Sequence, residues 1–168
     1  MAFSRDTNTL IPIMSSNTLP SGYVASAGSA LTGGYDAWKV FNGTCVDNTD
    51  NWCSAGGPPD WLAIQLPNPA QVTSYSIFPR YDSVGNSPKT WTLEGSNDGT
   101  NWTTINTQTN YTNWTVGVKQ TFSCSNSNYY SRHRINITAS ISASYIQIGE
   151  LELFGTVSTG PLRLAQVF

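Results

Sequence analysis

The sequence carries few charged side chains. Only 11% of its 168 residues are charged and its formal net charge is −2, whereas about a quarter of the residues in an average soluble domain are charged. A surface with so little charge gives no electrostatic reason to bind nucleic acid or anionic lipid. Its polarity must come instead from the many Ser, Thr and Asn residues, which are neutral and form hydrogen bonds.

The sequence also lacks long hydrophobic runs and a cysteine framework. No apolar run is long enough to cross a membrane, and the first six residues lack the basic and apolar regions of an export signal. We therefore expect that the protein does not insert into a membrane and that it is assembled in a cytosol. The three cysteines, Cys45, Cys53 and Cys124, are an odd number, which argues against a disulfide framework. A disulfide between Cys45 and Cys53, closing a small loop, is the alternative. The sequence has no His/Cys spacing of the kind that binds zinc.

Motifs of the common hydrolases and nucleotide-binding enzymes are missing. The sequence has no Gly-x-Ser-x-Gly, no phosphate loop and no metalloprotease motif. Glycoside hydrolysis needs two facing carboxylates, but the closely spaced Glu150 and Glu152 fall on one predicted strand. The single histidine, His133, stands between two arginines, and we expect it to be an exposed strand residue. The sequence therefore predicts no catalytic activity.

What the sequence does contain is aromatic residues and short alternating segments. Aromatic residues make up 12% of the chain, with six Trp and eight Tyr. Apolar and polar residues alternate with a period of two, which indicates strands, and no helical periodicity is sustained. The predicted strands span residues 61–66, 72–78, 91–95, 102–105, 134–137 and 145–148, and one more is expected within 111–122. The strand at 145–148 is expected to continue to residue 154 after a bulge at Gly149. Pro67 and Pro69 are expected to end the strand at 61–66. Many short strands without helices predict an all-β sandwich or barrel.

The composition also sets the two ends of the chain apart from the segment that contains the predicted strands. Residues 1–24, rich in Ser, Thr and Pro, are expected to form an extended arm or an edge strand, and packing of this arm on the domain is one of the alternatives. Residues 157–168 begin as a linker and end apolar, so we expect a docking tail for a partner, with packing on its own domain as the alternative.

Four segments resemble a known family. They are AWKVFNG at 37–43, WLAIQL at 61–66, PKTWTLEGSNDGTNW at 88–102 and IQIGELELFG at 146–155. In this order they resemble the F5/8 type C (discoidin-like) family, which includes the family 32 carbohydrate-binding modules. The resemblance implies a discoidin-like (galactose-binding-like) antiparallel β-sandwich or jelly roll over residues 25–156. It also implies a non-catalytic domain that binds cell-surface glycans.

The resemblance also implies a sugar site. Family members often use an Arg after the second long strand to donate hydrogen bonds to sugar hydroxyls, and Arg80 occupies that place, with Tyr81 and Asp82 beside it. A guanidinium suits paired oxygens, and an aromatic ring covers the apolar face of a sugar. Trp114 and Tyr111 lie in a polar segment and are expected to form the aromatic platform. The alternative for Arg80 is an ordinary ion pair with Asp82.

The other tryptophans match packing positions of the family. Trp52, Trp91 and Trp102 are expected in the core on this ground. Trp61 begins a predicted strand and is expected to be half-buried.

A structural Ca²⁺ ion is the cofactor that the resemblance implies. The candidate ligands are Asn42, Asp47, Asp50 and Glu150, whose oxygens suit a hard cation. Asn42 stands where the family has Asp, so one negative charge is lost. The alternative is a loop held by hydrogen bonds alone.

The N-terminal phrases LIPIMSS at 10–16 and PSG at 20–22 resemble the openings of such domains in phage tail and prophage proteins. They favour a virion component, in a tail, fibre or head decoration, that recognises host surface glycans as a homo-oligomer. A bacterial extracellular or cell-surface location is the alternative. A second hypothesis is a structural domain that joins other virion proteins through the C-terminal tail and has no active glycan site.

Overall fold

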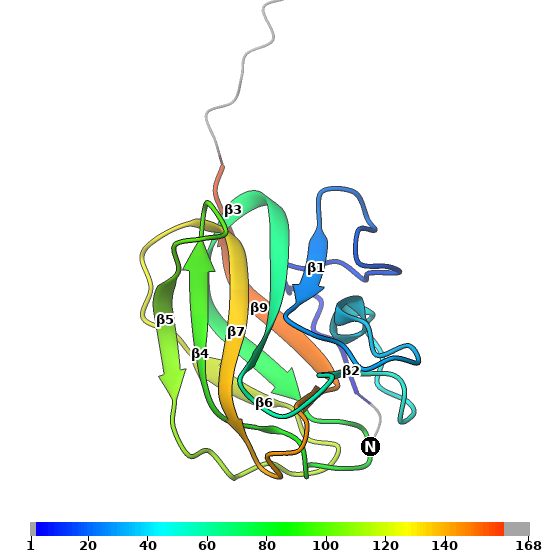
Figure 1. Ribbon diagram of the computed structural model, residues 1–168. Helices are drawn as coiled ribbons and strands as arrows, with labels where there is room; N and C mark the ends of the chain where they lie inside the picture. The colour runs from blue at the N-terminus through cyan, green and yellow to red at the C-terminus, as the bar shows by residue number, and fades with distance from the viewer. Residues whose placement is uncertain (1–2, 160–168) are drawn as a thin grey trace, which may run out of the picture.

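The protein folds as an antiparallel β-sandwich. The computed structural model describes residues 3–159, and Figure 1 shows their strands arranged in two packed layers. The predicted all-β, galactose-binding-like sandwich is confirmed. The strands are β1 (Val24–Ala27), β2 (Trp52–Cys53), β3 (Asp60–Phe78), β4 (Pro88–Ser96), β5 (Thr103–Gln108), β6 (Gln120–Ser123), β7 (Tyr130–Ser140), β8 (Gln147–Ile148) and β9 (Glu150–Val157).

The long strand β3 belongs to both layers. Its first half pairs with β1 and β7, and the sheet continues through β4 to β5. Its second half pairs with β6 and β9. The strand bends between Gln65 and Ala70, where its pairing with β7 shifts register. Our expectation that Pro67 and Pro69 end the strand was wrong. Both prolines are exposed and lie at the bend, outside the paired positions, so neither removes a ladder hydrogen bond.

The core fills the space between the two layers. Alternate residues of β3 and β7, among them Leu62, Ile64, Ile135 and Ile137, are buried. This is the result that the two-residue period predicts, because successive side chains of a strand point to opposite faces. The odd-numbered positions near the start of β3 therefore face outwards, away from the core.

Residues before the first strand pack on the domain. The Leu10 amide donates to the Leu153 carbonyl at 2.8 Å and the Met14 amide donates to the Phe41 carbonyl at 2.9 Å. The side chains of Ile11 and Met14 are buried in the same core. Most of the predicted docking tail, residues 160–168, lies outside the described residues.

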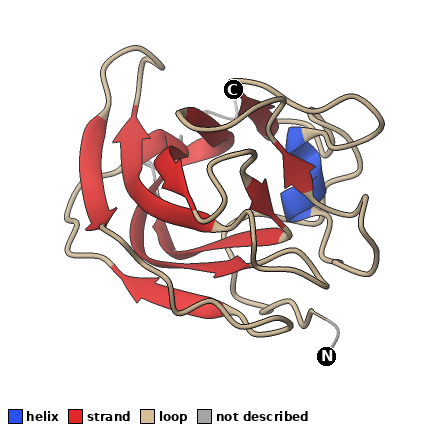
Figure 2. Cartoon of the chain, turned by 60° about the horizontal axis from the view of Figure 1, so that its bottom comes forward, coloured by secondary structure: helices blue, strands red, loops and turns tan. Residues whose placement is uncertain are grey.

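Helical structure within residues 3–159 is limited to one short 3-10 helix, η1 (Ala37–Phe41), drawn in blue in Figure 2. The sequence did not predict it. Its buried residues Ala37, Val40 and Phe41 pack into the core, which explains why a chain without helical periodicity forms this turn. No helix of this described part is long and apolar enough to cross a membrane.

The structure also tests the disulfide considered for Cys45 and the exposure predicted for His133. All three cysteines are free, so the loop-closing disulfide between Cys45 and Cys53 is not formed. Cys53 pairs with Gln147 in the β2–β8 ladder, whereas the Cys45 thiol lies against the Pro79 carbonyl. His133 is buried, with 1% of its surface exposed, so our expectation of an exposed residue was wrong. The register of β7 places it on the inner face.

Candidate functional site

Two loops meet at the lower end of the sandwich, where β3 ends (Figure 1). One follows β3 and spans residues 79–87, and the other spans 141–146. The Ile141 amide donates to the Ser87 carbonyl at 3.0 Å, and the Gln147 amide donates to the Asn86 carbonyl at 2.9 Å. These bonds tie the loops together, so side chains far apart in sequence share one surface.

Arg80 is the first partly exposed residue after β3, because Phe78 and Pro79 are buried. Its Nε and Nη2 atoms donate to the two oxygens of Asp82 at 2.6 and 3.0 Å. The Asp82 carboxylate raises the pKa of Arg80, chiefly through this hydrogen bond, and Arg80 lowers the pKa of Asp82 in return. The ion pair that we considered as the alternative is therefore present. It holds the guanidinium in one orientation and leaves Nη1 without an acceptor among residues 3–159.

Other groups around Arg80 were not singled out from the sequence. The phenols of Tyr35 and Tyr81 lie close enough to raise the pKa of the guanidinium. The amide of Asn86 donates to the side-chain oxygen of Gln147 at 2.9 Å. Tyr145, on the neighbouring loop, is 39% exposed. We call Tyr35, Arg80, Tyr81, Asp82, Asn86, Tyr145 and Gln147 the end-loop cluster. The sequence did offer one signal for Tyr145, because this tyrosine ends the polar segment SASY at 142–145, directly before an apolar strand.

Trp114 does not form an exposed platform, so this expectation was wrong. Only 7% of its surface is exposed, and its indole N–H donates to the Pro88 carbonyl at 2.7 Å. Its ring lies 5.0 Å from that of Tyr111 and 5.9 Å from that of Trp91, between ring centres. Tyr111 is half-buried in the same cluster of rings and also contacts Phe122. Both residues pack the domain because the segment before β6 folds back over the core.

The tryptophans predicted to pack the core divide into two groups. Trp52 and Trp91 are fully buried, as predicted. Trp102 is not in the core, so that expectation was wrong. It is half-exposed in the turn before β5, and the Arg134 guanidinium lies 4.2 Å from its ring centre. Trp61 is half-buried, as expected.

Three of the four predicted calcium ligands are brought together by the loop after η1. The Asn42 amide donates to Asp50 at 2.5 Å, and the Thr44 amide donates to Glu150 at 2.9 Å. The Thr44 hydroxyl and the Val46 amide donate to the other oxygen of Asp50, at 2.8 and 3.2 Å. The terminal strand β9 thus delivers Glu150 to a loop more than 100 positions earlier in the chain.

Glu150 is the unusual member of this group. It is 1% exposed, and its Oε2 atom has no hydrogen-bond partner. Burial, reinforced by the charge of Asp50, raises the pKa of Glu150 to about 9. Burial likewise raises the pKa of the adjacent Cys45 thiol to about 12. An unpartnered buried carboxylate oxygen is the kind of group that a cation would satisfy.

The fourth candidate, Asp47, is directed elsewhere. One of its oxygens accepts hydrogen bonds from the Thr49 amide and hydroxyl, both at 2.8 Å, in an exposed turn. These bonds lower the pKa of Asp47. Residues 3–159 hold no group of three or more acidic, His or Cys side chains placed to share a metal ion. A cation here would rely on two carboxylates together with amide, hydroxyl or backbone oxygens.

Comparison with known proteins now places this architecture. The family described as F5/8 type C, NedA-like, galactose-binding domain matches residues 42–135, more than half of the chain. The chain belongs to this family. The matched F5/8 type C region begins in the loop of Asn42 and ends within β7, so it contains Arg80. No curated protein sequence is significantly similar to this chain.

Solved structures share the F5/8 type C fold at low sequence identity. A family 32 module of a family 89 glycoside hydrolase from Clostridium perfringens, in complex with GalNAc-β-1,3-galactose, has a TM-score of 0.68 and 18% identity, covering 80% of this chain and 96% of its own. The family 32 module of NanJ from C. perfringens, in complex with galactose, has a TM-score of 0.64 and 19% identity, covering 79% and 93%. A chitosan-binding module from Paenibacillus sp. IK-5, in complex with chitotriose, has a TM-score of 0.66 and 21% identity, covering 80% and 97%.

Proposed function

We propose that this chain is a non-catalytic carbohydrate-binding domain whose end-loop cluster binds a neutral sugar of a cell-surface glycan. Membership of a family described as galactose-binding supports this proposal. Three neighbours of the same fold were solved with saccharides bound. The low charge of the chain also suits a ligand that offers hydroxyl groups rather than charges.

The observation that carries the proposal is the arrangement of Arg80. Asp82 accepts two hydrogen bonds from the Arg80 guanidinium and orients it, which leaves the Nη1 donors free within the described part of the chain, and the phenols of Tyr35 and Tyr81 contribute to its raised pKa. A preorganised donor loses little side-chain entropy when it binds, which favours affinity. The phenol rings provide apolar faces for the C–H groups of a sugar, and the Asn86–Gln147 pair adds further polar atoms at this end of the sandwich.

Within this proposal, we place the domain in a phage virion as a homo-oligomeric host-adhesion component. The only support is the likeness of residues 10–22 to phage tail openings. The competing role, structural assembly through the C-terminal tail without a glycan site, makes a different prediction. Under both hypotheses, truncation after Gly155 would abolish assembly. The truncated domain would still bind glycans if its role is adhesion, but not if its role is assembly alone.

Substitution of Arg80 tests the sugar site. We expect Arg80→Ala to weaken binding of galactose and galactosides at least about tenfold, because it removes charge-assisted hydrogen bonds. An exposed ion pair contributes little to stability, about 1 kcal/mol or less, so the free energy of unfolding should hardly change. Isothermal titration with galactose and a glycan array measure the binding, and thermal unfolding measures the stability.

A matched control is Lys89→Ala, which removes one positive charge from β4 without altering the end-loop cluster. It should bind as the unaltered protein does. Arg80 would be shown to form only an ion pair if Arg80→Ala binds galactose as tightly as the unaltered protein does. The same would follow if the folded, unaltered protein binds no glycan at all.

We further propose that the loop after η1 binds a structural Ca²⁺ ion, held by Asp50, Glu150 and the side-chain oxygen of Asn42. The ion would displace the proton that the buried Glu150 carboxyl keeps at neutral pH and fix the loop against β9, but it would take no part in sugar chemistry. The unpartnered Oε2 of Glu150 supports this proposal. The existing hydrogen bonds of Asn42 and Thr44 are the competing means of holding the loop.

Calcium should therefore stabilise the protein. At a concentration of 100 times Kd, a ligand specific for the folded state adds about 2.7 kcal/mol to the free energy of unfolding, so Tm should rise on addition of CaCl₂ and fall with a chelator. Glu150→Gln should lose this response, whereas Asp47→Asn should keep it because Asp47 is bonded to Thr49. A Tm that calcium leaves unchanged would favour the loop held by hydrogen bonds alone.

A further inference from the structure

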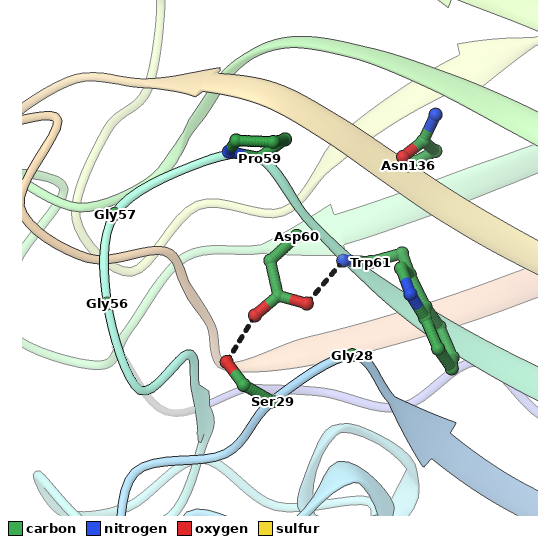
Figure 3. Close-up of a pocket in the computed structure, with 8 residues that line it drawn as sticks. All are labelled: Gly28, Ser29, Gly56, Gly57, Pro59, Asp60, Trp61 and Asn136. Carbon is green, nitrogen blue, oxygen red and sulfur yellow. Dashed lines mark hydrogen bonds between the residues drawn. The ribbon is translucent and has the colours of Figure 1, made fainter.

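One layer of the sandwich consists of β1, the first half of β3, β7, β4 and β5. The outer face of this layer carries a shallow trough that contains no residue of the end-loop cluster. Two hollows, of about 490 and 180 Å³, share the side chain of Trp61. The larger, shown in Figure 3, extends from Trp61 towards Ser29 and Gly57. The smaller extends from Trp61 along β3 to Trp102 and Arg132. We call the two hollows together the sheet trough.

The register of the strands explains the shape of the trough. Trp61, Ala63 and Gln65 alternate with core residues along β3, so their side chains point to the outer face, where Trp61 and Gln65 are partly exposed and Ala63 is covered by its neighbours. Ala63 lies opposite Ser26 of β1 and Arg134 of β7. The small side chains of Ala63 and Ser26 leave the floor low between the two tryptophans.

One side of the Trp61 indole packs closely against the backbone of Gly28. Gly28 approaches it so closely that a Cβ atom would lie 2.9 Å from the indole nitrogen and 2.2 Å from an oxygen of Asp60. Asp60 accepts hydrogen bonds from the Trp61 amide, at 2.7 Å, and from the Ser29 hydroxyl (Figure 3). A ring that is packed on one side has less freedom to lose when a ligand binds.

Trp102 is packed on one side in a similar way at the other end. The Arg134 guanidinium stacks on its ring, and the Arg134 Nε atom donates to Glu94 at 2.6 Å. Asn136 also donates to Glu94, at 3.3 Å. The neighbouring Arg132 donates to the Asn97 carbonyl at 3.0 Å and forms no salt bridge within residues 3–159, which leaves its charge free to meet a ligand.

The chemistry of the trough identifies an occupant. Its lining includes one acidic and one cationic side chain, Asp60 and Arg132. The Arg134–Glu94 ion pair beside Trp102 is also neutral as a whole, so a neutral ligand is favoured. Six residue steps from Pro59 to Gln65 span roughly 20 Å of strand, longer than a single sugar ring. Indoles match the flat faces of pyranose rings, and a guanidinium fork matches paired hydroxyls.

We propose that the sheet trough binds an extended, neutral, β-linked oligosaccharide, separately from the end-loop cluster. One sugar ring stacks on Trp61, another contacts Trp102, and Arg132 donates to hydroxyl groups between them. The trough thus adds a second site, for a chain of sugars, to the monosaccharide site proposed above. Two sites on one domain would raise avidity for a long glycan.

The test uses chitohexaose and cellohexaose as probes of the full chain. In two-dimensional NMR spectra, the indole N–H signals of Trp61 and Trp102 should shift on titration with at least one hexaose. By calorimetry, Trp61→Ala and Trp102→Ala should each weaken hexaose binding at least about tenfold. Arg80→Ala should bind the hexaose as before, although it loses galactose.

A control for the loss of an exposed ring is Tyr129→Ala. Tyr129 is 41% exposed and its hydroxyl lies 3.5 Å from that of Thr156 on β9, in the other layer. This variant should bind the hexaose normally. The proposal is overturned if neither hexaose moves the two indole signals, if both tryptophan variants bind as well as the unaltered protein, or if hexaose binding is lost only with Arg80. Self-association that depends on Trp61, without hexaose binding, would instead make the trough a protein interface.

Discussion

Replacement of Trp114 by alanine is expected to lower the free energy of unfolding by about 3–5 kcal/mol, the usual cost of deleting a large buried ring. Its indole is 7% exposed, donates to the Pro88 carbonyl and contacts the rings of Trp91, Tyr111 and Phe122. Removal would leave a cavity in this cluster and an unpaired carbonyl oxygen at the start of β4. The loss is a large part of the stability of a domain of this size.

Chemical denaturation of the Trp114→Ala and Trp114→Phe variants measures this effect. The Phe variant should lose less stability, because it keeps a ring but not the hydrogen bond to Pro88. Galactose binding of both variants should be unchanged under conditions where they remain folded. A Trp114→Ala variant that is fully stable but has lost sugar binding would restore the platform role that the sequence suggested.

The second large effect concerns pH and His133. Burial lowers the pKa of His133 from 6.5 to about 4, and the nearby Ala70 backbone offsets only part of that shift. In the unfolded chain the imidazole titrates near 6.5. Between these two values the unfolded state binds a proton that the folded state does not bind. Stability from this group is therefore complete above about pH 6.5, and it is lost as the pH falls towards 4.

A shift of this size corresponds to about 3 kcal/mol across that interval. Urea denaturation at pH 7 and at pH 4.5 should show the fall in the free energy of unfolding. His133→Leu fills a similar volume between Ile64 and Gly95, the strand partners of His133, and should reduce the fall by most of this amount. An equal fall in both proteins would mean that other groups cause the acid sensitivity.

The strands were predictable because one face of each is buried. Leu62 and Ile64 in β3, and Ile135 and Ile137 in β7, give the two-residue period directly, and the structure buries all four. The bend of β3 at its prolines was not predictable. Proline only removes a donor, and whether a strand ends there depends on whether a partner strand needs that donor.

The candidate sites were partly predictable. Arg80 could be placed at the end of a strand because the apolar run stops at Pro79. Glu150 could be matched to Asn42 only through the family resemblance. The aromatic residues were the least predictable, because Trp114 and Trp102 both stand among Asn and Thr and only one of them is buried.

The sequence by itself determined the all-β class, the strands and their inward faces, because alternation along a strand is a local property that folding must satisfy. Only the tertiary structure decided which aromatic rings are buried, which arginines form ion pairs with carboxylates and where the hollows lie. Those features depend on how β7 lies between β3 and β4 and on how segments 97–102 and 109–119 fold back. Such long-range contacts leave no periodic signal in the chain.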